Sequence, residues 1–483
     1  MVLVMHGCPP NIVWICADDF TPAMCGTYGN SVVRTPAIDR LANRGIRFDR
    51  AYCTCPLSTP SRQSFWTGRY PRSIGVTLPP TALPDDELTL PTMLRRAGYQ
   101  TAAFGKTHFY KPQRDQFSIS LDYPDYRRWF AARGDGGLDP SVRTLGPWRP
   151  FLDPTSVWLN SAVRPYPATD SSMFGTYLSH GAAEFLRHAA RPPFFLYVSY
   201  FETHSPFAFP VEFAGRHSPS EFPAPPVADD DWRRIPPVFQ ELTPSDVCGI
   251  QAAYAICTEF MDKNVGIVLD ALAASAFGPS TVVVFTSDHG YLLGQHGRFE
   301  KHCCYEEAIR AALIMSLPES QAEARSTGAV VQLMDLVPTL LEMCGLEIPS
   351  NIQAQSFLPV LRGERQEHHK TVFIEYSDNA EAAVMDGAWK AIYTTNRRRR
   401  RDGYALECAY AGPSVQLFNL ETDPQELTNL ASEAAHRPVL KRLLDLLGEH
   451  LVHTDRLGRG TDAAGTEEVF EACLEPVELA WQG

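Results

Sequence analysis

Short apolar runs alternate along the chain with longer segments of helical periodicity. Five of these runs are rich in β-branched and aromatic residues and predict buried strands: Asn11–Ala17, Thr101–Phe104, Phe194–Ser199, Thr281–Thr286 and Ala312–Ser316. Helical patterns predict four helices: Thr35–Ala42, Ser171–His188, Pro244–Ala273 and Val331–Cys344. This alternation predicts an α/β fold, with a large and mostly parallel sheet sandwiched by helices.

The pattern changes near residues 361–365, after which the elements become shorter. We predict two further strands and one helix there: Val372–Tyr376, Trp389–Tyr393 and Pro438–Leu451. The chain is therefore expected to divide into a large domain over residues 1–365 and a smaller C-terminal α+β domain over residues 366–483. The last residues, from about Gly458, are weakly patterned and are expected to form a tail.

Three segments lack regular periodicity. Residues 110–169 and 206–242 are rich in proline, and we interpret them as loops on the substrate side of the sheet or as surface excursions. Arg397–Arg401 is a run of five arginines, expected at a hairpin tip. A solvated loop accounts for this run, and contact with an anionic ligand is the alternative.

Composition narrows the function classes. Of the 483 residues, 44% are hydrophobic, which excludes a mainly disordered chain. There are 56 acidic against 43 basic residues, so a general nucleic-acid partner is not expected. The apolar runs are too short to cross a membrane, and the first residues lack the basic and apolar regions of a signal peptide. We therefore expect a cytoplasmic protein whose 12 scattered cysteines are idle or buried thiols.

Polar side chains follow four of the predicted strands. Asp18 and Asp19 come directly after the first, Lys106 and His108 after the second, His204 after the third, and Asp288 with His289 after the fourth. In parallel sheets, ligands bind outside the carboxyl ends of the strands. Any one of these residues alone would be an ordinary surface or core residue, but together they predict one site assembled from distant segments.

Three carboxylates and one imidazole form a plausible divalent-metal site. Asp18 and Asp19 repel each other unless a cation or a proton lies between them, and Asp288 with His289 would complete the set. Ligation that is rich in oxygen favours Ca²⁺, Mg²⁺ or Mn²⁺ over Zn²⁺.

A second candidate feature is the segment Ser58-Thr59-Pro60-Ser61-Arg62. Pro60 suits the first turn of a helix, which places Ser58 near a helix N-terminus, where anions are favoured. Arg62 lies one turn further and can face the same point. By itself the segment is also compatible with a plain capped helix.

This segment, with Thr67-Gly68 after it, resembles the serine form of the sulfatase signature. The resemblance extends over residues 11–430 in the expected order. It includes the opening strand with Asp18 and Asp19, Gly105-Lys106-Thr107-His108, Ser287–Gly290, and Gly294–Gly297 followed by Lys301. The chain is therefore identified as a member of the sulfatase family, for which an alkaline-phosphatase-like fold is expected.

The resemblance implies a role for each matched residue. The metal, usually Ca²⁺, would be bound by Asp18, Asp19, Asp288, His289 and the modified Ser58, with Mn²⁺ or Mg²⁺ as alternatives because His289 stands where many members have Asn. Ser58 would be oxidised to formylglycine (3-oxoalanine) before the chain folds. Its hydrate would attack sulfur and release inorganic sulfate. The remaining roles are these: Arg62 holds the modified side chain, Lys106 and Lys301 neutralise the sulfate, His108 contacts the formylglycine, and His204 lies near the bridging oxygen. His296 and His302, which lie close to the last segment, are interpreted as structural.

The implied activity is therefore sulfuric ester hydrolysis on a sulfated small molecule or saccharide. A radical-type sulfatase-maturing enzyme would be a transient partner, because this enzyme type oxidises the serine form. Two alternatives remain: a phosphomonoester, phosphodiester or phosphonate-ester hydrolase on the same fold, and a non-catalytic binding protein. The matched polar residues argue against the binding protein.

Overall fold

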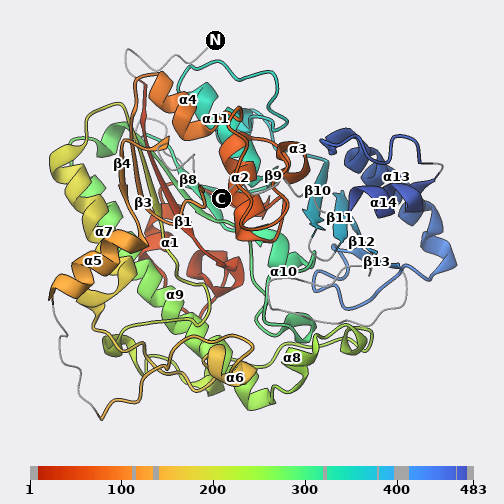
Figure 1. Ribbon diagram of the computed structural model, residues 1–483, viewed down its shortest axis with the longest axis horizontal. Helices are drawn as coiled ribbons and strands as arrows, with labels where there is room; N and C mark the ends of the chain where they lie inside the picture. The colour runs from red at the N-terminus through yellow and green to blue at the C-terminus, as the bar shows by residue number, and fades with distance from the viewer. Residues whose placement is uncertain are drawn as a thin grey trace.

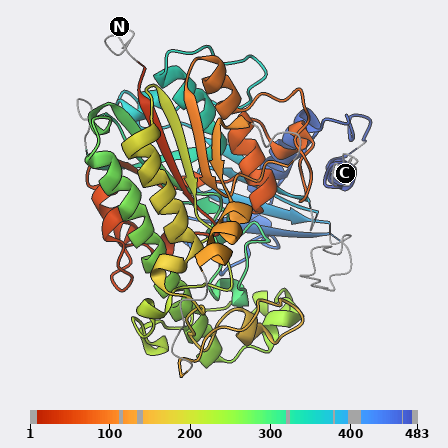
Figure 2. The same ribbon diagram turned by 60° about the vertical axis from the view of Figure 1, so that its left-hand side comes forward.

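The computed structural model describes residues 9–110, 116–133, 141–318, 324–377, 380–395, 413–463 and 465–475. A large sheet runs through the larger part of the molecule with helices on both sides, and a small sheet with its own helices lies at one edge (Figures 1 and 2). The predicted arginine hairpin, Arg397–Arg401, lies outside the described residues.

The large sheet is mixed and mostly parallel, as predicted. Its strands run in the order β4 (Ile119–Leu121), β3 (Gln100–Gly105), β5 (Phe194–Ser199), β1 (Asn11–Ala17), β6 (Thr281–Ser287), β8 (Leu313–Ser316), β2 (Ile46–Tyr52) and β7 (Arg310–Ala311), with β9 (Arg325–Gln332) paired to β2. The strands from β4 to β6 are all parallel. Beyond β6, β8 is antiparallel to both of its neighbours, and β7 is antiparallel to β2.

The central strand β1 is buried on both faces. Its side chains point alternately to the two faces and therefore belong to two different cores. Ile12, Trp14 and Cys16 belong to the core with α2 (Ser58–Thr67), α4 (Leu90–Arg96) and α11 (Leu336–Met343). Val13 and Ile15 belong to the opposite core with α1 (Pro36–Ala42), α7 (Phe174–Glu184) and α9 (Pro244–Ala273). A strand enclosed in this way reads as a continuous apolar run, which is why the sequence predicts it well.

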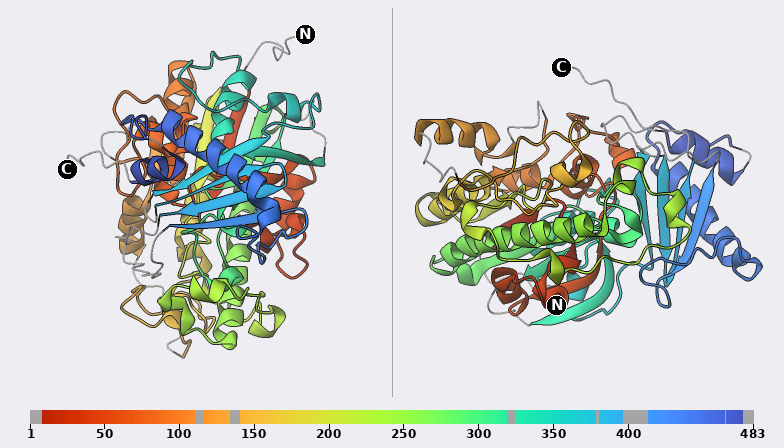
Figure 3. Two further views of the ribbon diagram at one scale, coloured as in Figure 1. Left: turned by 90° about the vertical axis from the view of Figure 1, so that its right-hand side faces the viewer. Right: turned by 90° about the horizontal axis from the view of Figure 1, so that it is seen from below.

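The C-terminal part contains a four-stranded antiparallel sheet. It is formed by β10 (Thr371–Tyr376), β11 (Glu381–Asp386), β12 (Trp389–Thr394) and β13 (Ser414–Asn419). One face packs against α13 (Arg437–Thr454) and α14 (Thr466–Cys473), as Figure 3 shows. The other face, with Ile374 and Met385, joins the core around α2. The boundary at residue 365 stays a prediction.

Two expectations about elements are wrong. The predicted helix at Val331–Cys344 begins too early, because Val331 and Gln332 end strand β9 and α11 begins at Leu336. The expected tail after Gly458 contains a helix, α14, because Phe470 and Cys473 are buried against the small sheet and α13.

The irregular segments 110–169 and 206–242 contain the helices α5 (Tyr123–Arg133), α6 (Thr155–Trp158) and α8 (Pro237–Gln240). Other connections contain α3 (Pro71–Ile74), α10 (Glu306–Ile309) and α12 (Leu358–Leu361). Within the described ranges, no helix combines the length and the apolar character needed to cross a bilayer. The ten cysteines in those ranges are free thiols, as expected from their scatter.

Candidate active site

The predicted strand-end residues lie together at one edge of the large sheet. Strands β3, β5, β1 and β6 are neighbours in the sheet and are parallel, so their carboxyl ends point the same way. Ion pairs and hydrogen bonds then connect the residues that follow these strands, as described below. The structure therefore brings together residues that are more than 280 positions apart in the sequence.

Asp18, Asp19, Asp288 and His289 form a buried cluster whose four potential ligand atoms all lie within 4.8 Å of one another. Nε2 of His289 is 3.5 Å from Oδ1 of both Asp19 and Asp288. Nδ1 of His289 is 2.9 Å from the carbonyl oxygen of Gly290 and can donate its proton there, which leaves Nε2 free to act as a ligand. Three carboxylates and one imidazole fit a hard divalent cation.

Ser58 is the first residue of α2, and its hydroxyl lies against this cluster. Ser58 Oγ is 3.1 Å from Asp18 Oδ1 and 3.0 Å from His289 Nε2. The residue is only 4% exposed. The prediction that Ser58 stands at a helix N-terminus is confirmed, and the side chain points to the predicted metal ligands.

Arg62 lies one turn further along α2 and is completely buried. It forms ion pairs with Asp18 and Asp288, at 3.2 and 2.9 Å. Its Nη1 also donates to the carbonyl of Lys106, the hydroxyl of Tyr197 and the hydroxyl of Ser199. Arg62 thus holds the predicted metal ligands themselves.

Two lysines place positive charge at the same point. Lys106 Nζ pairs with Asp18 Oδ2, and Lys301 Nζ lies 2.6 and 2.8 Å from the two oxygens of Asp19. Burial raises the pKa of the Asp18 carboxyl, but Lys106 and Arg62 overcome this effect and hold the pKa well below its usual range. The pKa of Asp19 is lowered as well, so the carboxyls of Asp18 and Asp19 are ionised at neutral pH.

His108 and His204 lie near different members of the site. Nδ1 of His108 is 3.2 Å from Thr59 Oγ1, beside Ser58, and Nε2 of His204 is 3.7 Å from Asp19 Oδ2. Burial lowers the pKa of both imidazoles, so they are neutral at pH 7. A neutral imidazole is suited to accepting a proton.

The backbone is strained at this site. Asp19 and His108 have φ angles of 56° and 55°, in the left-handed region that non-glycine residues rarely adopt. Such strain persists where the surrounding structure holds it, and it is concentrated at functional sites.

Sequence reasoning missed several supporting residues. Ser61 Oγ donates to the carbonyl of Asp288 at 2.5 Å, and its place inside the signature was an available signal. Tyr254, in the middle of α9, donates its hydroxyl to the carbonyl of Asp19 at 2.7 Å. Nothing in its helical pattern distinguishes Tyr254 from a core tyrosine. His296 and His302 each lie near an acid, with Nδ1 2.9 Å from Asp231 Oδ2 and 3.1 Å from Glu300 Oε2.

A cavity of about 490 Å³ adjoins the cluster. It is lined by Lys106 and His108 together with Tyr110, Arg128 and Phe201. Volumes of this order are typical of small-molecule sites.

Comparison with known proteins agrees with this geometry. The sulfatase family model matches residues 10–346, which is most of the chain. The chain belongs to the sulfatase family. It is thus a sulfuric ester hydrolase, and a second model, for the C-terminal region of N-sulphoglucosamine sulphohydrolase, matches residues 294–452.

Individual sulfatases and related structures resemble the chain over most of its length. N-acetylglucosamine-6-O-sulfatase from Bacteroides thetaiotaomicron is 27% identical, over 91% of this chain and 86% of its own. The phosphonate monoester hydrolase of Agrobacterium radiobacter has a similar fold, with a TM-score of 0.77 at 21% identity over 94% of this chain and 99% of its own. A protein solved in complex with its substrate D-glucosamine-2-N,6-O-disulfate gives a TM-score of 0.71 at 22% identity, over 95% of this chain and all of its own.

Proposed function

We propose that this sulfatase cleaves the sulfate esters of saccharides by means of a formylglycine formed from Ser58. The observation that supports this most directly is the position of Ser58 Oγ, within hydrogen-bond distance of Asp18 and His289. A reactive oxygen at this point would face the predicted metal ligands. The buried cations Arg62, Lys106 and Lys301 pair with those same ligands.

The metal would be held by Asp18, Asp19, Asp288 and His289, with an oxygen of residue 58 as a further ligand. The ligand set is rich in oxygen and contains no thiolate, so Ca²⁺ is the expected ion, with Mn²⁺ or Mg²⁺ as alternatives. When bound, such an ion would stabilise negative charge on the oxygens around it.

The chain's own residues would divide the remaining work. Lys106 and Lys301 would bind the sulfate oxygens and stabilise the charge that develops on the transferring group. Arg62 would keep Asp18 and Asp288 in place. A proton must reach the leaving alcohol oxygen, and Lys301 would supply it from its ammonium group, because burial keeps His204 neutral at pH 7. His108, neutral at pH 7, would take the proton from the residue-58 hydroxyl as inorganic sulfate is released.

A sulfated saccharide is the proposed substrate class. This is supported by the resemblance to an N-acetylglucosamine-6-O-sulfatase and by a similar fold that binds a glucosamine disulfate. The cavity beside Lys106 has aromatic side chains at Tyr110 and Phe201, against which a sugar ring can pack. A radical-type maturing enzyme in the cytoplasm would act on Ser58.

The first test is a mass spectrum of the tryptic peptide 51–62, from protein co-expressed with a serine-competent maturing enzyme. We expect a loss of two hydrogens at Ser58, with carbonyl reactivity. An intact serine, where the maturing enzyme works on a control protein, would contradict the proposal.

The second test compares two serines of the same helix. Ser58→Ala should abolish turnover of sulfated saccharides and leave the fold intact. Ser64→Ala is the matched control, because Ser64 is also buried in α2 but its hydroxyl has no hydrogen-bond partner among the described residues. A parallel panel of phosphate and phosphonate esters covers the alternative activity, and higher turnover on that panel would support it instead.

A further inference from the structure

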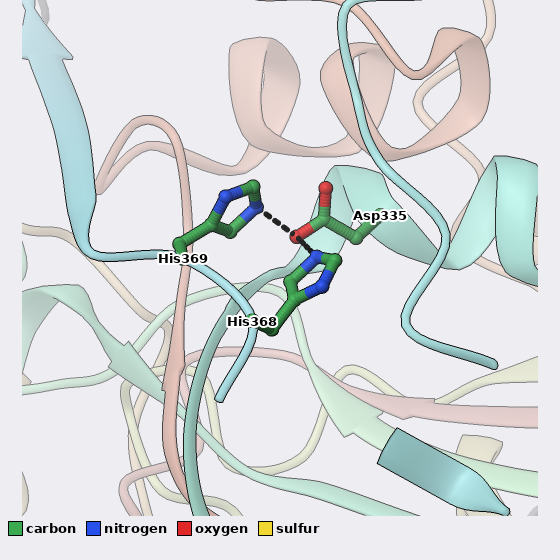
Figure 4. A group of neighbouring side chains, drawn as sticks. All are labelled: Asp335, His368 and His369. Carbon is green, nitrogen blue, oxygen red and sulfur yellow. Dashed lines mark hydrogen bonds and ion pairs between the residues drawn. The ribbon is translucent and has the colours of Figure 1, made fainter. Parts of the chain in front are cut away.

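A second group of metal-binding side chains lies far from Ser58 in the sequence. Asp335 ends the short 3₁₀ turn at 333–335 that leads into α11, while His368 and His369 lie in the segment just before β10. Figure 4 shows both imidazoles directed at the carboxylate of Asp335. None of the three residues takes part in the proposed hydrolysis.

The two histidines are adjacent in the chain and still face one point. Nε2 of His369 is 2.8 Å from Asp335 Oδ2, and Nε2 of His368 is 3.5 Å from the same oxygen. The ring centroids are 4.2 Å apart. Neighbouring residues of an extended segment normally point to opposite sides, so this backbone is shaped to converge both rings.

The carboxylate is held in place before any ligand arrives. Its Oδ2 accepts a hydrogen bond from the backbone N–H of Gln332 at 2.8 Å, and its Oδ1 accepts one from Gln355 at 2.9 Å. Asp335 is fully buried, and the ion-pair partners that the described part of the chain offers it are the two imidazoles. No permanent cation is among them.

One nitrogen in the group is only weakly paired. His368 Nε2 is buried, and its contact with Asp335 Oδ2, at 3.5 Å, does not have the geometry of a hydrogen bond. A buried polar atom of this kind costs free energy unless something pairs with it. A metal ion between the rings and the carboxylate would pair with it.

We propose that Asp335, His368 and His369 form a second metal site, for Zn²⁺ or a similar transition-metal ion. Two imidazole nitrogens and one carboxylate oxygen are a ligand set that Zn²⁺ uses, with water at the fourth position. The side chains of His368 and His369 are 7% and 12% exposed, so the site lies near solvent. This set is richer in nitrogen than the cluster at Asp18, so the two sites would select different ions.

The site would act as a clip between two parts of the fold. Asp335 belongs to the connection from β9 to α11 in the large domain, and His368 and His369 lead into the first strand of the small sheet. Binding of an ion to the folded state alone stabilises that state by mass action.

The test is zinc binding by the full-length chain after chelator treatment, followed by equilibrium dialysis and elemental analysis. In the background Asp288→Asn, which disables the other cluster, we expect one zinc ion per chain. His368→Gln or His369→Gln should weaken this binding by more than about 100-fold, since loss of even an outer partner of a metal ligand weakens binding by about 10–100-fold. The exposed His188→Gln is the matched control and should bind zinc normally.

A second measurement does not depend on the folding of a variant. Zinc should protect the peptide that carries His368 and His369 from carbethoxylation by diethylpyrocarbonate, and should leave the labelling of His188 unchanged. Equal zinc content in the wild type and both histidine variants, or unchanged labelling of that peptide, would overturn the proposal and leave a plain ion-paired histidine cluster.

Discussion

At the scale of single residues, Arg62 connects more of the site than any residue described above. Its guanidinium reaches both Asp18 and Asp288, and it also binds Tyr197, Ser199 and a backbone carbonyl. A planar group with five donors can serve all of these acceptors at once, which lysine cannot do.

We therefore predict that Arg62→Met destabilises the fold by about 3–5 kcal/mol, because it leaves the buried Asp288 without its arginine and, within the described residues, leaves Asp18 paired with Lys106 alone. Turnover should also be lost. Arg40→Met is the control, since the Arg40–Asp270 pair is exposed and such pairs contribute about 0–1 kcal/mol. Urea denaturation of both variants measures the difference, and equal losses would refute this ranking.

The burial of Glu202 should make the free energy of unfolding depend on pH. Its Oε2 is buried and has no hydrogen-bond partner in the part of the chain that the structure describes, and burial raises the pKa of the carboxyl from 4.5 to about 7. Between these values the folded state binds the proton and the unfolded state does not, so stability falls as pH rises through that window. Each pKa unit corresponds to about 1.4 kcal/mol.

Glu202→Gln removes this titration and should flatten the stability profile between pH 4.5 and 7 relative to the wild type. The exposed Glu184→Gln should leave the profile as it is. Thermal unfolding at a series of pH values provides the comparison. Parallel profiles for the wild type and Glu202→Gln would show that the carboxyl is ionised throughout.

Residues at strand ends could be predicted because each follows a local pattern. Asp18 and Asp288 follow apolar runs, and the parallel pairing of β1 with β6 brings the two residues together at one edge of the sheet. Tyr197 and Tyr254 could not be predicted, because their role depends on which atoms of Arg62 and Asp19 they meet across the fold. A tyrosine inside an apolar strand or helix carries no sign of such a contact.

At the scale of elements, the end of β3 determines where Lys106 lies. Gly105 has a φ of +99°, and a Cβ atom there would lie 2.0 Å from the carbonyl oxygen of Ser199 in β5. Gly98 has a similar φ of +92° but open space around it. Comparing substitutions at the two glycines therefore separates the effect of steric overlap, which only Gly105 has, from the effect of the positive φ, which both share.

We predict that Gly98→Ala costs about 1–2 kcal/mol, from its left-handed backbone alone. Gly105→Ala should cost clearly more and should lower kcat, because β3 must move away from β5 and carry Lys106 with it. Denaturation and steady-state kinetics on both variants test this. A kcat for Gly105→Ala equal to that of Gly98→Ala would contradict it.

The strands enclosed by helices are easier to predict from sequence than β9, which pairs parallel with β2 at the far side of the sheet. β1, β5 and β6 are enclosed by helices and are buried along their whole length. β9 begins with a half-exposed alternating stretch and runs directly into the turn before α11, so a helical period masks its end. Neither strand type nor helix start is decided by local sequence at such a junction.

At the scale of the whole molecule, Arg72 joins the two parts of the chain. This buried residue of α3 pairs with Glu375 of β10 at 3.1 Å and with Asp455, after α13, at 3.6 Å. It also donates to Ser377. The apolar core continues across the same junction.

Arg72→Met should destabilise the protein by about 3–5 kcal/mol, because it leaves the buried Glu375 without its arginine and removes one of the two arginines that pair with Asp455. We also expect faster proteolysis near the junction at residues 362–370. Lys441→Met, at an exposed pair with Asp445, is the control. Proteolysis at the wild-type rate would show that apolar packing alone holds the junction.

The burial of Ser58 has a consequence for the timing of synthesis. If a maturing enzyme oxidises this residue, it must do so before folding buries Ser58. The site cannot close before β6 is synthesised, because Asn11 of β1 pairs with Thr281 of β6. Roughly 220 residues separate Ser58 from Thr281, and at about 5–20 residues per second their synthesis takes about 10–45 s. Chains that pass this interval unmodified would fold around an intact serine. The active fraction of a preparation would then depend on the rate of oxidation relative to the rate of translation. Slower translation would raise the active fraction.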